Sequence, residues 1–195
     1  PFWSPDAEWV GYGTATTMMK VARTGGQPTI LANVSGAQDI GSGGSGSWNA
    51  DGSILFTTGS TGVLRLSDRG GRVTMHHPTQ TGEVDFHQIN RLPGDRGWLL
   101  IVHTERSFGT IGILTPTGER KNVLTIDTDN FGDPVWSPSG HILFHRTGVA
   151  EGVWAAPFSL DRLEVTGEPF LVAAGASNPS VAADGTLAYS TGLQD

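Results

Sequence analysis

The sequence predicts an all-β protein of the β-propeller class, built from four-stranded antiparallel blades. A strand–turn–strand pattern recurs five times at intervals of 43 to 45 residues, which is the length of one four-stranded blade. Glycine, which favours tight turns, occurs 28 times among 195 residues. Proline and glycine interrupt every segment that would otherwise form a long amphipathic helix, and residues 160–164 would make one helical turn at most.

The recurring unit places a turn between two strands. The turn falls at equivalent positions in the five copies, namely Asp6, Asp51, Gly94, Ser139 and Asp184. Asp favours such turns because its side chain bonds nearby backbone, and Gly favours them because it adopts positive φ. The second strand of each copy is expected at residues 9–13, 54–58, 98–103, 141–145 and 186–190. A third strand, a Gly-rich turn and a fourth strand would complete each blade.

Residues that recur at one position of the repeat are interpreted as structural. Trp3, Trp48 and Trp136 share a position, and we expect them to pack between blades rather than to stack on a ligand. The full set of structural repeat positions is Trp3, Pro5, Asp6, Trp48, Asp51, Gly52, Trp136, Pro138, Gly140, Asp184 and Gly185.

The composition excludes several classes of partner and site. Twelve Lys and Arg against nineteen Asp and Glu give a net charge of −7, which argues against a nucleic-acid partner. There are no cysteines, so disulfides and thiolate metal sites are excluded. No apolar run is long enough for a membrane helix and no signal peptide is present, so we expect no membrane contact by this segment itself.

Two stretches carry a resemblance to known propellers. Trp3-Ser4-Pro5-Asp6 resembles the repeat motif of the TolB-like (PD40, WD40-like) family, whose motif peptidase and lyase propellers share. Residues 156–169, followed by Asn178-Pro179 and residues 184–189, resemble the C-terminal propeller blades of bacterial transmembrane serine/threonine kinases. This resemblance implies a six-bladed parent, a sensor role and a periplasmic or otherwise extracytoplasmic location.

Blade boundaries follow from the repeat. We expect a single, partial propeller over residues 1–195, with blades at about 1–34, 46–77, 88–126 and 133–174 and a half blade at 178–190. About four and a half of the six implied blades are therefore present. The half blade lacks its third and fourth strands, so either residues are missing from this sequence or another chain covers the exposed sheet faces as an oligomer.

Linear catalytic motifs are absent. The sequence has no Gly-rich kinase loop with its lysine, no His-Arg-Asp loop and no G-x-S-x-G. Residues 41–46 match G-x-G-x-x-G, but a strand and a turn follow where a dinucleotide site needs a helix. Residues 127–133 resemble a calcium loop, but Phe131 and Pro138 occupy positions that need oxygen ligands. We therefore assign no metal site and no cofactor.

A ligand is expected on the propeller face that gathers the inter-blade loops and the loops between second and third strands. Asp39 and Glu83 belong to this face. Its candidate ligand-binding residues are His76, His77, Asp85, His87, Glu105, Arg106, Asp127, Asp129, Asp133, Arg146 and Glu151. The face is net acidic, so the expected partner is a small cationic or hydroxyl-rich ligand, or a protein with a basic patch.

Two classes of function remain open. The favoured one is a non-catalytic module for ligand sensing or protein–protein interaction, part of a kinase-like receptor, and on this interpretation the chain is not an enzyme. The alternative is the propeller of an enzyme, either a His- and metal-dependent polysaccharide lyase or an accessory propeller of a prolyl-oligopeptidase-like hydrolase. Related lyase propellers use His and a metal near the axis. The residues suited to such chemistry are His76, His77, His87, His103, His141 and His145.

Overall fold

A computed structural model of the chain describes residues 1–34, 45–59, 62–148 and 150–192. Within these residues the regular structure is almost entirely β-strand, and the one helical element is a three-residue 3₁₀ turn at Pro93–Asp95. The predicted all-β propeller class is confirmed. Residues 160–163 form a turn and no helix. In the described part of the chain, no helix has the length and apolar character that crossing a membrane requires.

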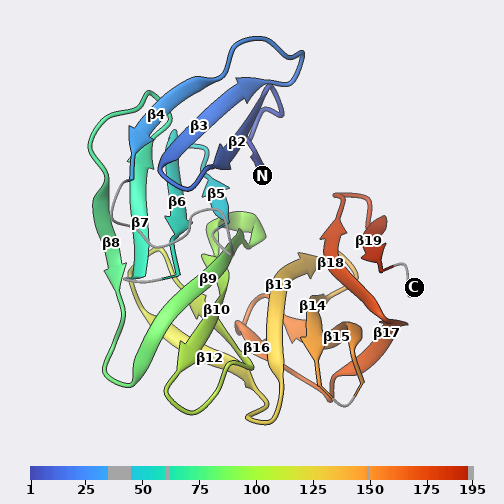
Figure 1. Cartoon of the computed structure of the whole chain (residues 1–195). Helices are drawn as coiled ribbons and strands as arrows, with labels where there is room; N and C mark the ends of the chain where they lie inside the picture. Colours follow the sequence, from blue (N-terminus) through green and yellow to red (C-terminus); the bar gives the residue numbers. More distant parts are fainter. Residues whose placement is uncertain (35–44, 60–61, 149, 193–195) are drawn as a thin grey trace. The chain divides into compact units, whose positions relative to one another are not determined.

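The chain divides into two compact units, Pro1–Ile89 and Asn90–Asp195. Each unit is described by itself, and the single-domain prediction stays a prediction. Unit 1 holds two antiparallel four-stranded sheets. In the first sheet, strands β2, β3 and β4 lie side by side in Figure 1. The strands are β1 (Phe2–Trp3), β2 (Trp9–Gly13), β3 (Thr17–Ala22) and β4 (Thr29–Asn33), then β5 (Gly46–Trp48), β6 (Ser53–Thr57), β7 (Gly62–Ser67) and β8 (Thr74–Pro78).

Unit 2 continues the pattern. Strand β9 begins in unit 1 and ends in unit 2, and its sheet has the order β12-β11-β10-β9. In the next sheet, β15 pairs with both β16 and β17, and β18 and β19 form a two-stranded sheet. The strands are β9 (Glu83–Arg91), β10 (Trp98–Thr104), β11 (Thr110–Leu114), β12 (Arg120–Thr125), β13 (Asn130–Ser137), β14 (His141–Thr147), β15 (Gly152–Ser159), β16 (Glu164–Val165), β17 (Phe170–Ala174), β18 (Ala176–Val181) and β19 (Leu187–Thr191).

At three turn positions of the repeat, an Asp side chain closes the turn between the first and second strands by accepting hydrogen bonds. Oδ1 of Asp51 accepts hydrogen bonds from the amide of Ser53 at 2.9 Å and from its hydroxyl at 2.6 Å. Asp6 and Asp184 accept the amide two residues later in the same way, at 3.0 and 2.9 Å. These bonds favour the charged carboxylate, so the Ser53 hydroxyl and then its amide hold the pKa of Asp51 below its usual value.

Phe2, and not Trp3, fills the packing position at the first strand. The Phe2 ring meets the Trp48 ring edge-on, with centroids 6.4 Å apart, and both belong to the core of unit 1. Trp48 is buried and Trp136 is partly buried against the core of unit 2, but Trp3 is 59% exposed, so the packing prediction is wrong for Trp3. Neighbouring residues of a strand point to opposite faces, and only one of Phe2 and Trp3 can point inward.

Two glycines leave room for the Phe2 ring. A methyl group added at Gly11 or at Gly46 would lie 2.3 Å from ring carbons of Phe2, well inside van der Waals contact. Gly11 lies on β2 and Gly46 on β5, so the ring is held between the two sheets of unit 1. The core of unit 2 likewise packs the β9–β12 sheet against the sheet that follows it, through residues such as Ile101, Ile113 and Phe144.

Replacing Gly46 by Ala is expected to lower the free energy of unfolding by about 1–3 kcal/mol, because the added methyl group overpacks the Phe2 ring. Chemical denaturation measures the change. Gly192→Ala is the control, since a methyl group there meets no atom within 4 Å. In the double variant Phe2→Ala/Gly46→Ala the cost of the methyl group should largely vanish, and a full cost in that background would refute the packing explanation.

Replacing Asp51 by Ala is expected to destabilise the fold at neutral pH by roughly 1 kcal/mol or less, because the turn loses its acceptor at an exposed site. The pKa of Asp51 is lowered in the fold, so its contribution is present above the unfolded pKa, near 3.8, and is lost as pH falls through the folded pKa. Denaturation of wild type and variant at pH 7 and in acid should show the difference shrinking. Asp127→Ala, whose side chain accepts no hydrogen bond from the described residues, is the control. An Asp51 effect that persists unchanged in acid would contradict the assignment.

Candidate functional site

Unit 1 holds a partly buried imidazole–carboxylate pair on β9. Asp85 and His87 are two residues apart on one strand, so their side chains lie on the same face. Nε2 of His87 lies 3.0 Å from Oδ1 of Asp85, and the two side chains are only 22% and 15% exposed. Gly59 leaves room for this arrangement, because a methyl group there would lie 2.9 Å from Cε1 of His87.

The donor atoms of this pair suit a divalent cation. Imidazole nitrogen and carboxylate oxygen are ligands that manganese and similar ions accept. Two ligands on adjacent corners of an octahedron with bonds of about 2.1 Å lie roughly 3 Å apart. The observed separation of 3.0 Å agrees with that spacing. Asp85 and His87 therefore fit a metal ion in both chemistry and geometry.

The other histidines of unit 1 lie on β8. His76 and His77 are consecutive, so their side chains leave opposite faces of the strand. The His77 ring stacks on Phe86 with centroids 6.2 Å apart. Burial, with smaller contributions from Arg65 and His77, lowers the pKa of His76 and favours its neutral form. The strand geometry therefore does not join His76 and His77 into one chelating pair.

Unit 2 holds a second pair, formed between a buried carboxylate and a guanidinium. Nε of Arg146, near the end of β14, donates to Oδ2 of Asp129, whose side chain is 1% exposed. The Arg146 guanidinium also lies over the Trp154 ring, 4.2 Å from its centroid. The Trp154 indole nitrogen in turn donates to the carbonyl of Ala150 at 2.8 Å. Arg146 is thus fixed by a charged partner and by an aromatic face.

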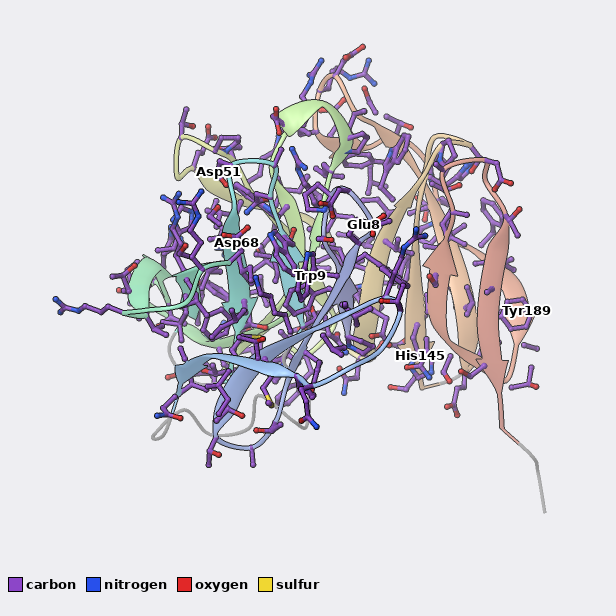
Figure 2. All side chains as sticks on the ribbon, turned by 90° about the horizontal axis from the view of Figure 1, so that it is seen from above. Glu8, Trp9, Asp51, Asp68, His145 and Tyr189 are labelled. Atoms are coloured by element: carbon purple, nitrogen blue, oxygen red, sulfur yellow. The ribbon has the colours of Figure 1, made fainter. Side chains whose placement is uncertain are left out.

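His145, labelled in Figure 2, directly precedes Arg146 on β14. Its Nε2 is buried, has no hydrogen-bond partner among the described residues, and lies 3.6 Å from Oε1 of Glu151. Opposite it, β13 has a bulge between Gly132 and Val135 that contains Asp133. Burial raises the pKa of Asp133, and the charge of His145 opposes this in part. This end of unit 2 therefore combines a basic imidazole with a carboxyl that resists ionisation.

A strained backbone position recurs at 45-residue spacing in three successive first strands. Gln88, Asp133 and Asn178 have φ of 51°, 50° and 51°, in the left-handed region that residues other than Gly rarely adopt. The bulges at Asp133 and Asn178 interrupt the strand pairing there. Asp133-Pro134 and Asn178-Pro179 are dipeptides that favour such interruptions, and this signal was present in the sequence.

The expected ligand-binding residues are thus distributed over both units. Unit 1 brings together Asp85 and His87, and unit 2 brings together Asp129 and Arg146. Asp133 and Glu151 lie near His145. Glu105, Arg106 and Asp127 are exposed loop residues of unit 2. Asp39 and most of the 41–46 loop lie outside the described residues. Whether any of these residues binds a ligand stays a prediction.

A hollow of about 270 Å³ in unit 1 has a structural explanation. It is lined in part by Trp9, Lys20, Trp48 and Asp68, and Figure 2 shows Trp9 and Asp68 close together. The Lys20 ammonium lies 4.6 Å from the Trp9 ring centroid and 5.7 Å from that of Trp48. It also donates to the carbonyl of Asp68 at 2.8 Å. The two indoles therefore pack around a lysine that links the two sheets of unit 1.

Comparison with known proteins bears on fold and function. Neither protein-family models nor curated proteins match this chain. Among solved structures, an oligogalacturonate lyase in complex with manganese superimposes with a TM-score of 0.62 at 12% sequence identity. The alignment covers 96% of this chain, which spans 64% of the length of the matched chain.

This comparison corrects one expectation. The interpretation of the chain as non-catalytic is contradicted, because the matched structure is that of an enzyme. The absence of a G-x-S-x-G or a kinase loop is weak evidence against catalysis, since an active site assembled from separate strands leaves no contiguous motif in the sequence. At 12% identity the likeness establishes the architecture, and the chain has the β-propeller fold.

Proposed function

We propose that this chain is the propeller of a metal-dependent lyase that acts on an acidic oligosaccharide. The Asp85–His87 pair carries the proposal, since its two donor atoms are partly shielded from solvent and 3.0 Å apart, a spacing that suits a shared divalent cation. The likeness of the fold to a lyase in complex with manganese supports the same reaction class. Because the chain spans 64% of that structure, the activity and the substrate belong to the proposal.

The chemistry of an elimination divides among a few groups. Asp85 and His87 would hold the cation, which when bound acts as a Lewis acid toward a substrate carboxylate. An elimination further needs a base that takes a proton from the substrate. A sensor role linked to kinases and a location outside the cytoplasm stay predictions.

Removing either member of the pair is expected to abolish metal binding and turnover together. Wild-type protein with manganese should convert trigalacturonate to an unsaturated product, followed by its ultraviolet absorbance, and a chelator should stop the reaction. His87→Ala and Asp85→Asn should weaken manganese binding by at least about tenfold, measured by titration calorimetry. Each variant removes a metal ligand, and the loss of a residue that only supports a ligand already lowers metal affinity by about that factor. Asp161→Asn, at an exposed carboxylate of unit 2, is the control and should bind manganese like wild type.

Alanine variants of the other histidines identify any further ligand. These are His76, His77, His103, His141 and His145. A wild-type protein that holds no manganese, or an His87→Ala variant that holds it as tightly as wild type, would defeat the metal assignment.

Gly59→Ala tests whether the room left for His87 matters. The added methyl group should displace the imidazole and weaken manganese binding by roughly tenfold. Gly25→Ala is the matched control, because Gly59 and Gly25 have φ of 69° and 87°, yet a methyl group at Gly25 meets nothing within 4 Å. Both variants should lose similar stability, roughly 1 kcal/mol, from the strained backbone. Equal manganese affinities in the two variants would show that Gly59 does not position His87.

A further inference from the structure

We propose that Arg146 is a carboxylate-binding residue, which recognises the acid group of a uronate sugar through its terminal guanidinium nitrogens. The proposal rests on the proposed function for the class of ligand, and it adds a binding residue in unit 2. Its basis is the way in which Asp129 and Trp154 hold the guanidinium. Asp129 engages Nε and Trp154 engages one face, so the two terminal nitrogens stay available for an end-on bidentate contact with a carboxylate.

Asp129 holds Arg146 from the side of Nε. The Asp129 carboxylate is 1% exposed, accepts Nε of Arg146 and also accepts the hydroxyl of Thr128 at 3.0 Å. Gly148, with φ of 121°, approaches the same carboxylate so closely that a methyl group there would lie 2.9 Å from Oδ1. The carboxylate is therefore enclosed by its neighbours, and it fixes the direction in which the guanidinium points.

Trp154 holds Arg146 from one face. The ring centroid lies 4.2 Å from the guanidinium carbon, and the bond from the indole nitrogen to the carbonyl of Ala150 keeps the ring in place. A guanidinium that is stacked and paired loses little further freedom when it binds a ligand. The 17% of the Arg146 side chain that stays exposed leaves a path for a ligand.

The terminal guanidinium nitrogens of Arg146 remain available to a ligand. A guanidinium has five N–H donors, and the Nε donor is the one that Asp129 takes. Within the described residues, the terminal nitrogens of Arg146 have no hydrogen-bond acceptor. Arg65 and Arg96 differ, because each pairs with an exposed carboxylate through a terminal nitrogen. Four N–H donors in a planar fork match the two oxygens of a carboxylate.

The surrounding charge selects a carboxylate over a more highly charged anion. Asp129 neutralises the positive charge of Arg146, and the chain as a whole carries a net charge of −7. A phosphate dianion would be repelled more strongly than a monoanionic carboxylate in such a setting. Hydrogen-bond geometry, rather than net attraction, would therefore provide the specificity.

The test measures trigalacturonate binding by titration calorimetry, with a chelator present so that no metal contributes. Arg146→Gln should bind roughly 10- to 100-fold more weakly than wild type, as expected for a lost charge-assisted, bidentate contact. Arg146→Lys should fall between them, because the charge remains and the fork is lost. Arg96→Gln, which removes an exposed paired arginine, should bind like wild type. Fully methyl-esterified trigalacturonate should bind weakly and equally to all of these variants.

A second variant distinguishes a loss of binding from a loss of folding. Arg146→Gln leaves the buried Asp129 charge without its partner, so the double variant Asp129→Asn/Arg146→Gln, with thermal unfolding as a check, repeats the measurement on a neutral pair. Equal binding by wild type and either Gln variant would overturn the proposal, as would a wild type that binds no trigalacturonate or binds triglutamate just as tightly. Arg146-dependent binding without formation of product would instead leave this proposal standing and refute the lyase activity.

Discussion

Burial of the sheets on both faces is the constraint on which this molecule depends. Every residue of β6 and of β11 is buried, so no face of these strands is available for polar chemistry. A sheet of this kind cannot be stable alone, because it needs apolar cover on either side. The polar residues of these two strands, Ser53, Thr57 and Thr110, accordingly lie at strand ends. The Arg146 pair lies where a strand ends, and Asp85 and His87 lie on a first strand that carries a bulge position.

The same constraint explains why the fold could be predicted from the sequence, whereas the pairing of the candidate site residues could not. The repeat is periodic because each sheet needs the same apolar strands and the same Asp-closed turn, so Asp51 and Asp184 could be placed from the sequence alone. The two candidate pairs lack such periodicity. Asp85 and His87 are close enough to be grouped by eye, but Asp129 and Arg146 are 17 residues apart, and only the pairing of β13 with β14 brings them together.

The two failed expectations have physical causes. Trp3 shares a repeat position with Trp48, yet the turn that follows Trp3 is one residue longer, and Phe2 takes the inward direction instead. The non-catalytic interpretation relied on the absence of contiguous motifs, which reveals little about a scaffold whose functional groups come from separate strands. The acidic composition predicted a cationic ligand, whereas the guanidinium of Arg146, held by Asp129 and Trp154, is proposed to bind an acid.

The bulge in the first strands has an implication for how such a scaffold diversifies. Gln88, Asp133 and Asn178 share one backbone conformation but carry an amide, a carboxyl and again an amide. The main chain therefore tolerates different chemistry at a position whose geometry it keeps. A duplicated blade can exchange this one side chain while its hydrogen-bond ladder and apolar faces stay as they were. New ligand specificity would then arise by substitution of a single residue per blade, while the fold stays unchanged.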